Sequence, residues 1–346
     1  MSWYEYTGAI HIHTSDSDGT EPFAEIVKLA QKTKLDFLLF SDHLTLKSLY
    51  AGLEGWYDKV LAVVGYEIHD ENNQNHYLVF NLDEILPFGL SAEQYAKEAI
   101  QRGGMGIIAH PDEIRNNLKE FPPYPWNNWN IDYFDGIEIW NEMSEWMESL
   151  TRFNQLKMIF SPRKALKSPT DRILKKWDEL NRKRKVVGIG AIDAHAFSYP
   201  LFGPFKITIF PYDVQFKSIR THILTTESLS TQPNQAKKQL LGALKNCQAF
   251  VSNFRWGDAK GFSFIAQTSD KEATIGETVN MNKENQIKFS AKTPSKCYIK
   301  LLCDGKTVAE SRGKEIDYAT SQRGNYRIEC YKNSKGWIYS NHIRIT

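Results

Sequence analysis

The sequence predicts an α/β fold followed by a smaller all-β region. From residue 7 to about residue 210, short apolar runs alternate with helical patterns, whereas from about residue 258 onward only short alternating runs follow. The chain has 346 residues, which is more than one compact core usually holds, so we expect two domains. Repeated alternation of strand and helix indicates a parallel sheet, either doubly wound or closed as a barrel.

The predicted strands of the first region are short and apolar along their whole length. This is the pattern of strands that are buried on both faces of a sheet. The runs that show it are Phe37–Phe40, Leu61–Val64, Gly106–Ala109, Gly136–Trp140 and Val186–Ile189.

Two helices are predicted between these strands. Residues 23–30 and residues 92–99 each carry apolar side chains at i, i+3, i+4 and i+7. Ser91 and Gln94 form a capping-box pattern at the start of the second helix. An aromatic and proline-rich loop at 121–129 interrupts the alternation of strands and helices. This loop is either a wall of a substrate pocket or an ordered surface crossover.

The last part of the chain reads as a small all-β domain, which we expect to be a sandwich. Its alternating runs at 286–290, 297–302 and 326–330 are separated by glycine-containing turn signals. We therefore predict a first domain at 1–255 and a β-sandwich domain at 256–346. The second domain has no cluster of chemically reactive residues, so we expect it to serve packing, substrate gating or oligomerisation.

Composition and charge narrow the functional class. Lysine and arginine total 43 against 41 aspartate and glutamate, and this balance disfavours nucleic acid as a partner. No run of about 18 apolar residues and no basic, apolar leader is present, so we expect a cytoplasmic protein that does not enter a membrane. The four cysteines form no C-x-x-C pair, which favours reduced, mostly buried thiols.

Histidines and carboxylates gather at the ends of the predicted strands. In a barrel of parallel strands such ends meet at one mouth, although they are far apart in the sequence. A lone histidine at a strand end is more often structural than a ligand, but so many at corresponding ends would leave many desolvated polar groups that metal ions can satisfy. The residues concerned are His11, His13, Asp18, His43, Glu67, His76, His110, Asp193 and His195.

The residue types also indicate which metals to expect. Mixed histidine and carboxylate ligation suits Zn, Mn or Fe, whereas thiolate-rich zinc sites and all-oxygen magnesium sites use other ligands. The sequence has no G-x-S-x-G motif of a serine hydrolase. It therefore predicts a metal centre with mixed histidine and carboxylate ligands.

These motifs resemble the PHP (polymerase and histidinol phosphatase) superfamily of metal-dependent phosphoesterases. The resemblance covers roughly the first 250 residues, and the tail, ending Trp337–Asn341, resembles the subgroup that includes carbaryl hydrolase and microcin-processing proteins. It implies a distorted seven-stranded (β/α) TIM-like barrel with two or three divalent metal ions. The motifs that carry it are His11-x-His13 with Ser17-Asp18-Gly19, Ser41-Asp42-His43, Gly65-x-Glu67, His76, Ala109-His110-Pro111 and Asp193-x-His195.

The resemblance also implies which residue binds which ion. His11, His13, Glu67 and Asp193 would hold the first metal. Glu67 would bridge to a second metal held by His76 and His110, while Asp18, His43 and His195 would hold a third. His69 lies two residues after Glu67 and is the alternative to His76; we prefer His76 and assign His69 to the surroundings of the site or to substrate contact.

The expected activity is that of a phosphoesterase on a small phosphorylated metabolite or nucleotide. A metal-bridging hydroxide would attack phosphorus, with Glu67, Asp193 and His195 as the catalytic residues. Arg115, Asn141 and His69 are the candidate substrate-binding residues. One alternative is an amide, carbamate or ester metallohydrolase on the same site, and another is a non-catalytic binding module. The sequence identifies neither the substrate nor the oligomeric state.

Overall fold

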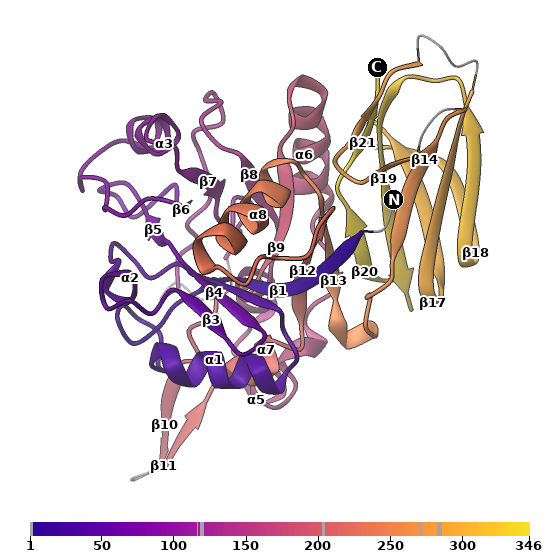
Figure 1. Cartoon of the computed structure of the whole chain (residues 1–346). Coiled ribbons are helices and arrows are strands. Elements are labelled where there is room, and N and C mark those ends of the chain that lie inside the picture. The colour runs from indigo at the N-terminus through magenta and orange to yellow at the C-terminus, as the bar shows by residue number, and fades with distance from the viewer. Residues whose placement is uncertain (1–2, 116, 118–120, 203–204, 270–271, 282–285) are drawn as a thin grey trace.

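The computed structural model describes residues 3–115, 117, 121–202, 205–269, 272–281 and 286–346. Within these residues the chain is a mixed α/β protein with one large sheet, a second sheet of five strands and a two-stranded hairpin (Figure 1). The described helices are too short or too polar to cross a membrane.

The first part of the large sheet has the order β13-β12-β1-β2-β4-β3. β1, β2 and β4 are parallel, as the sequence predicts, whereas β12 and β13 add in antiparallel fashion beyond β1. The bounds are β1 (Tyr4–Ile12), β2 (Phe37–Phe40), β3 (Gly55–Tyr57), β4 (Val60–Val64), β12 (Ile219–Thr225) and β13 (Ala249–Asn253).

The second sheet has the order β5-β6-β7-β8-β9. β7, β8 and β9 are parallel to one another, and β6 is antiparallel to both of its neighbours. The bounds are β5 (Tyr66–Ile68), β6 (Tyr77–Phe80), β7 (Met105–Ile108), β8 (Gly136–Asn141) and β9 (Val187–Ala191), and the separate hairpin consists of β10 (Ser198–Phe202) and β11 (Phe205–Thr208).

The closed seven-stranded barrel expected from the sequence is not confirmed. The two sheets are open, and they are joined by two isolated parallel bridges, Ile12 with Ala194 and His43 with Glu67, and by backbone hydrogen bonds such as that from the Ile192 amide to the Ile10 carbonyl at 3.0 Å. β6 and β12 are antiparallel to their neighbours, whereas an all-parallel barrel would have parallel strands at these positions. Both bridges lie at the strand ends that carry the predicted site, so these ends are held together there.

Helices cover the outer faces of both sheets. The predicted helices at 23–30 and 92–99 are confirmed as α1 and α3, and the capping box is present, with the Gln94 amide N–H donating to Ser91 Oγ at 3.4 Å. The bounds are α1 (Phe23–Lys32), α2 (Lys47–Tyr50), α3 (Ala92–Gln101), α4 (Glu142–Ser149), α5 (Gln155–Phe160), α6 (Asp171–Lys183), α7 (Tyr212–Gln215) and α8 (Pro233–Lys245), with 3₁₀ turns at Pro162–Lys164 and Phe254–Trp256.

From β14 onward the helical pattern gives way to strands, as predicted (Figure 1). β20 pairs with β13, so the large sheet continues into this region. The first half of β17 pairs with β14 and its second half with β19, and Phe289, Tyr326 and Trp337 are buried in the cluster that these strands enclose. The bounds are β14 (Ser263–Gln267), β15 (Glu272–Thr274), β16 (Thr278–Val279), β17 (Ile287–Cys303), β18 (Lys306–Thr320), β19 (Gly324–Lys332), β20 (Lys335–Ser340) and β21 (Ile343–Ile345). The division of the chain at 255/256 stays a prediction.

Candidate metal centre

The nine predicted ligands come from six separate strand ends and lie at one place in the structure. His11 and His13 come from the end of β1, which is followed by the loop with Asp18. His43 follows β2 and Glu67 lies in β5. His76 precedes antiparallel β6, so the start of that strand reaches the same edge as the ends of the others. His110 follows β7, and Asp193 and His195 follow β9.

The backbone of three of these residues is in the left-handed region. The φ angles are 69° for His11, 26° for His110 and 51° for Asp193. The pairing of β1 with β2 shifts register between Ile10 and Ile12, so His11 lies at a bulge. A non-glycine residue in this region costs about 1–3 kcal/mol, and such strain concentrates at functional sites.

Glu67 lies at the centre of the cluster, with about 1% of its surface exposed. Its Oε2 is 3.0 Å from His11 Nε2, 3.3 Å from His13 Nε2 and 3.4 Å from His43 Nδ1. Its Oε1 is 2.8 Å from His76 Nδ1 and 3.2 Å from His110 Nε2. The two oxygens therefore face two different sets of imidazoles, which is the arrangement that a bridging carboxylate requires.

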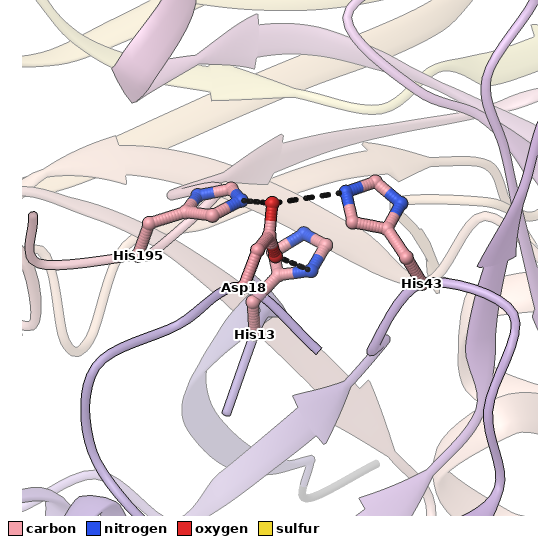
Figure 2. Close-up of side chains that lie close together, drawn as sticks. All are labelled: His13, Asp18, His43 and His195. Atoms are coloured by element: carbon pink, nitrogen blue, oxygen red, sulfur yellow. Dashed lines mark ion pairs between the residues drawn. The ribbon is translucent and has the colours of Figure 1, made fainter. Parts of the chain in front are cut away.

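Asp193 and Asp18 complete the cluster on either side of His195. Asp193 Oδ1 is 3.4 Å from His11 Nε2 and 3.5 Å from His195 Nδ1. Figure 2 shows Asp18 between three imidazoles: Oδ2 is 3.2 Å from His195 Nε2 and 3.5 Å from His43 Nε2, and Oδ1 is 3.4 Å from His13 Nδ1. The buried Asp193 and the half-exposed Asp18 thus place carboxylate oxygens on both sides of the imidazoles.

Charge couples the carboxylates and imidazoles tightly. Burial opposes ionisation of Glu67, but the neighbouring histidines hold the pKa of this carboxyl well below its usual range. Burial likewise lowers the pKa of the His13 imidazole, yet Asp193 and Glu67 outweigh it and raise that pKa to about 9. For His43 burial dominates and lowers the pKa to about 3. The three carboxylates therefore stay ionised and need positive charge beside them.

The donor atoms fit divalent cations. Both ring nitrogens of His13, Nδ1 of His43 and Nδ1 of His110 are buried without a hydrogen-bond partner. No lysine or arginine of the described residues pairs with Glu67, Asp193 or Asp18, so those residues supply the three carboxylates with no permanent cation. Four sets of donor atoms each lie within 4.8 Å of one another: His13, Asp18, His43 and His195; His11, Glu67 and His110; His11, His13 and Asp193; and His43, Glu67 and His76.

Glu138 of β8 orients the cluster from behind, a role that the sequence analysis did not assign. His11 Nδ1 donates to Glu138 Oε1 at 2.6 Å, which leaves His11 Nε2 directed at Glu67. Glu138 Oε2 accepts from the His110 amide at 2.7 Å and from Asn141 Nδ2 at 2.8 Å. The signal in the sequence is that Glu138 is the one charged residue in a six-residue strand that is otherwise apolar or amide-bearing.

Asp42 fixes the loop that carries Asp18. Its Oδ1 accepts from the Thr14 amide at 2.7 Å and from Ser17 Oγ at 2.6 Å, and its Oδ2 accepts from Thr14 Oγ1 at 2.9 Å. The Asp42 side chain is therefore used in holding Asp18 near the histidines.

A cavity of about 790 Å³ opens over the cluster. Of the candidate substrate-binding residues, Arg115 and His69 line it, and so do Phe121 and Tyr124 of the aromatic loop. Asn141 is not among the described lining residues, because its side chain caps α4 by accepting from the Ser144 amide and donates to Glu138. His69 Nδ1 donates to the Asp70 carbonyl, and the ring stacks on His76, which itself contacts Glu67. The roles of these residues stay predictions.

Comparisons with known proteins give low similarity. No family model and no curated protein matches the sequence. A two-domain protein from Bacteroides vulgatus, containing a predicted PHP-like metal-dependent phosphoesterase, has a TM-score of 0.47 and 13% identity over 98% of this chain and 95% of its own. PsfC from Pseudomonas syringae has a TM-score of 0.42 and 14% identity over 67% of this chain and 87% of its own.

A third structure comes from Bifidobacterium adolescentis and is assigned by prediction as a metal-dependent phosphoesterase. It has a TM-score of 0.34 and 15% identity over 58% of this chain and 92% of its own. Two of these three structural neighbours are thus PHP-like or metal-dependent phosphoesterases. At these identities and TM-scores, a functional assignment has to rest on the side chains of the site. The resemblance of the tail to carbaryl hydrolases is not tested by these neighbours and stays a prediction.

Proposed function

We propose that this chain is a metal-dependent hydrolase that cleaves a phosphoester of a small metabolite or nucleotide. The observation that carries the proposal is the position of Glu67, whose two oxygens lie within 3.4 Å of five histidines from four strand ends. A buried carboxylate surrounded by imidazoles is a ligand set for divalent Zn, Mn or Fe.

The proposed ligand sets share Glu67 and divide the other residues between two or three ions. His11, His13 and Asp193 would hold one ion with Glu67, and His76 and His110 would hold a second with Glu67. Asp18, His43 and His195 would hold a third. When bound, these ions would supply Lewis-acid polarisation of a phosphoryl oxygen and make water a usable nucleophile near neutral pH.

The residues that face the cavity would bind and orient the substrate. Arg115 Nε is buried without a partner and could donate to a phosphoryl oxygen. His195 lines the cavity next to Asp18, and with no ion at the third set it is the proposed donor of a proton to the leaving oxygen. His69 lines the cavity on the other side, where Tyr124 stacks on His76.

One observation favours the alternative of an amide, carbamate or ester hydrolase. Arg115 is the only lysine or arginine among the described residues that line the cavity, and it already pairs with Glu113. A site with so little positive charge of its own also suits an uncharged acyl substrate, which the same kind of metal centre can hydrolyse.

Two measurements separate these functions. Metal content of the purified protein is measured first, and phosphate release from a panel of phosphorylated metabolites is then compared with cleavage of aryl esters and amides. We expect two or three divalent ions per chain and turnover of a phosphoester. Strong ester or amide cleavage without phosphate release would overturn the phosphoesterase proposal.

Matched histidine variants distinguish an enzyme from a binding module. His13→Ala removes a proposed ligand, whereas His222→Gln changes a buried histidine that contacts Thr7 and Ser252 away from the cluster. We expect His13→Ala to lose metal and activity and His222→Gln to keep both. Equal activity in the two variants would contradict the proposed centre.

A further inference from the structure

The cavity over the metal centre has two unlike ends. One end carries the histidines and carboxylates of the cluster. The other end is apolar and is formed by residues of α4, α5 and the segment before α7, where the lining side chains are Met143, Trp146, Met147, Leu150, Ile159 and Ile209. The volume of about 790 Å³ is that of a site for a whole small molecule, with room beyond a phosphate group.

We infer, on the basis of the proposed phosphoesterase function, that the substrate is a phosphate monoester of an apolar alcohol with a bulky alkyl or aryl group. The phosphate would lie at the histidine end and the apolar group against α4 and α5. This inference narrows the substrate class of the site beyond a small phosphorylated metabolite.

The α4 side of the apolar wall is packed into the interior, whereas Ile159 of α5 is half-buried. Met143, Trp146 and Leu150 belong to a buried cluster with Met158 and Phe210. Met147 and Ile209 pack against that cluster from the cavity side. An apolar group in the cavity would therefore contact side chains that are already held in place, and little conformational entropy would be lost on binding.

A chain of hydrogen bonds fixes this wall relative to the metal centre. His11 Nδ1 donates to Glu138, Asn141 Nδ2 donates to the same carboxylate, and Asn141 Oδ1 accepts from the Ser144 amide at the start of α4. Glu113 makes a second link, since it accepts from Ser144 Oγ at 2.5 Å and from the Tyr124 amide at 2.8 Å. The distance between the reacting end and the apolar end is thereby set by the fold.

The charge of the lining favours a single anionic group. Arg115 is the only lysine or arginine among the described lining residues, and Glu113 pairs with it. A di- or triphosphate would bring further charges without further cationic partners from the chain. Along the apolar wall Gln155 is the only described lining residue with a polar side chain, so a sugar would leave most of its hydroxyls unpaired there.

Binding of alkylphosphonates tests the inference without turnover. Hexylphosphonate and methylphosphonate carry the same headgroup, and their affinities for the metal-loaded protein are measured by titration calorimetry. Each methylene that enters the apolar end should tighten binding about fourfold. We therefore expect hexylphosphonate to bind at least about tenfold more tightly than methylphosphonate. Equal affinities would overturn the inference.

Two variants of α5 form a matched pair for this measurement. Ile159 lines the cavity, whereas Leu156 on the same helix is 70% exposed and is not among the lining residues. Ile159→Gln should reduce the preference for hexylphosphonate about fourfold or more, and Leu156→Gln should leave it unchanged. Equal loss in both variants would place the alkyl group elsewhere and contradict the inference.

Turnover distinguishes failure of this inference from failure of the proposed function. Phosphate release is compared for hexyl phosphate and glycerol phosphate. The inference expects the hexyl ester to have the higher kcat/KM. Faster release from glycerol phosphate would overturn the inference and leave the phosphoesterase function standing. Release from neither ester, together with tighter binding of hexylphosphonate, would overturn the phosphoesterase function and leave the apolar preference of the site standing.

Discussion

Two buried clusters of ionisable side chains differ in where their positive charge comes from. At the strand ends, Glu67, Asp193 and Asp18 face imidazoles, and no lysine or arginine of the described residues pairs with them. Between α6 and β19, Arg327 donates to Asp178 Oδ1 at 2.7 Å through Nε and to Oδ2 at 2.8 Å through Nη2. The second cluster therefore contains its own cation.

Hydrogen bonding distinguishes the two clusters in the same way. Arg327 Nη1 donates to Glu329 at 2.6 Å, and His342 Nε2 lies 2.8 Å from Asp178 Oδ1. At the strand ends, in contrast, ring nitrogens of His13, His43 and His110 have no hydrogen-bond partner. One ring nitrogen of the cluster between α6 and β19, His342 Nδ1, also lacks a partner, whereas the strand-end cluster has four such nitrogens. A buried polar cluster whose groups are mostly paired supports the fold, whereas one with several unpaired donor atoms fits a bound ligand.

The largest effect is expected from removing the carboxylate that both sets of imidazoles share. Glu67→Ala should remove the two ions that Glu67 would share and leave at most one ion, at Asp18, His43 and His195, because no other described carboxylate lies among His43, His76 and His110 in the same way. Hydrolysis should fall by about 10³-fold or more. Elemental analysis and phosphate release measure the two losses.

The control for this variant is a test of whether it still folds. Circular dichroism and urea unfolding should show that Glu67→Ala remains folded, since the other cluster is untouched. A variant that kept its metal and more than a tenth of the activity would contradict the central role of Glu67.

Breaking the cluster between α6 and β19 should lower the stability of the fold and not its metal content. Arg327→Met leaves Asp178 and Glu329 buried without their cation, and loss of one partner of a buried ion pair typically costs about 3–5 kcal/mol in the free energy of unfolding. Urea unfolding measures this loss. Metal content of the folded fraction should be unchanged. An Arg327→Met variant that lost metal but kept the stability of the wild type would contradict the structural role of this cluster.

The sequence predicts the individual elements of the fold better than their pairing. The apolar run Phe37–Phe40 is β2, and the runs at 61–64 and 136–140 fall within β4 and β8. Periodicity does not reveal partners, and β1 pairs with β12, which lies more than 200 residues further along the chain. The seven-stranded barrel is therefore not confirmed, since the sheets of the structure are open.

The candidate site could be predicted as a set of residues but not as a geometry. Histidines and carboxylates at strand ends are visible in the sequence, and the structure brings all nine together. Glu138 was not assigned because its partner His11 is 127 residues away. Asn141 was placed among the substrate-binding residues from its position at a strand end, and its use as the cap of α4 becomes visible only with the Ser144 amide in place.

Metal binding should stabilise the native chain through the strand-end cluster alone. A ligand that binds only the folded state at 100 times its Kd adds about 2.7 kcal/mol to the free energy of unfolding. We expect added Zn or Mn to raise the Tm of the wild-type protein and of Arg327→Met, and a chelator to lower both. A metal-induced shift of the same size in Glu67→Ala would show that the ions bind elsewhere.

A smaller effect on metal affinity is expected from Glu138, which acts through His11 and His110. Glu138→Gln keeps the size of the side chain but removes the charge that orients the His11 Nδ1–H. Loss of such a positioning residue typically weakens metal binding about 10–100-fold. Competition with a chromogenic chelator measures this change, and excess metal should restore most of the activity. An unchanged metal affinity would contradict the positioning role and would mean that Glu138 only links β8 to α4.

The smallest effect concerns the pH dependence of stability in the α6–β19 cluster. Burial lowers the pKa of the His342 imidazole below the ordinary value of 6.5 against the attraction of Asp178, with Arg327 and Arg344 adding to the lowering. The unfolded chain then takes up a proton that the folded chain does not, so stability falls as the pH drops below about 6.5. The pKa of Asp178, which hydrogen bonds from Arg327 hold below its ordinary value of 3.8 against the effect of burial, adds a loss only near and below pH 3.8.

Between pH 6.5 and 4.5, the difference between the wild type and a variant that lacks this imidazole therefore reports on His342. The loss is at most about 1.4 kcal/mol per pH unit for one proton. His342→Gln retains a side-chain N–H for Asp178 but cannot titrate, so its free energy of unfolding should fall less steeply than that of the wild type over this range. The strand-end histidines titrate in both proteins, and their contribution cancels in the difference between the two urea-unfolding series. Identical slopes would mean that His342 is protonated in the folded chain, and the α6–β19 cluster would then carry a second cation beside Arg327.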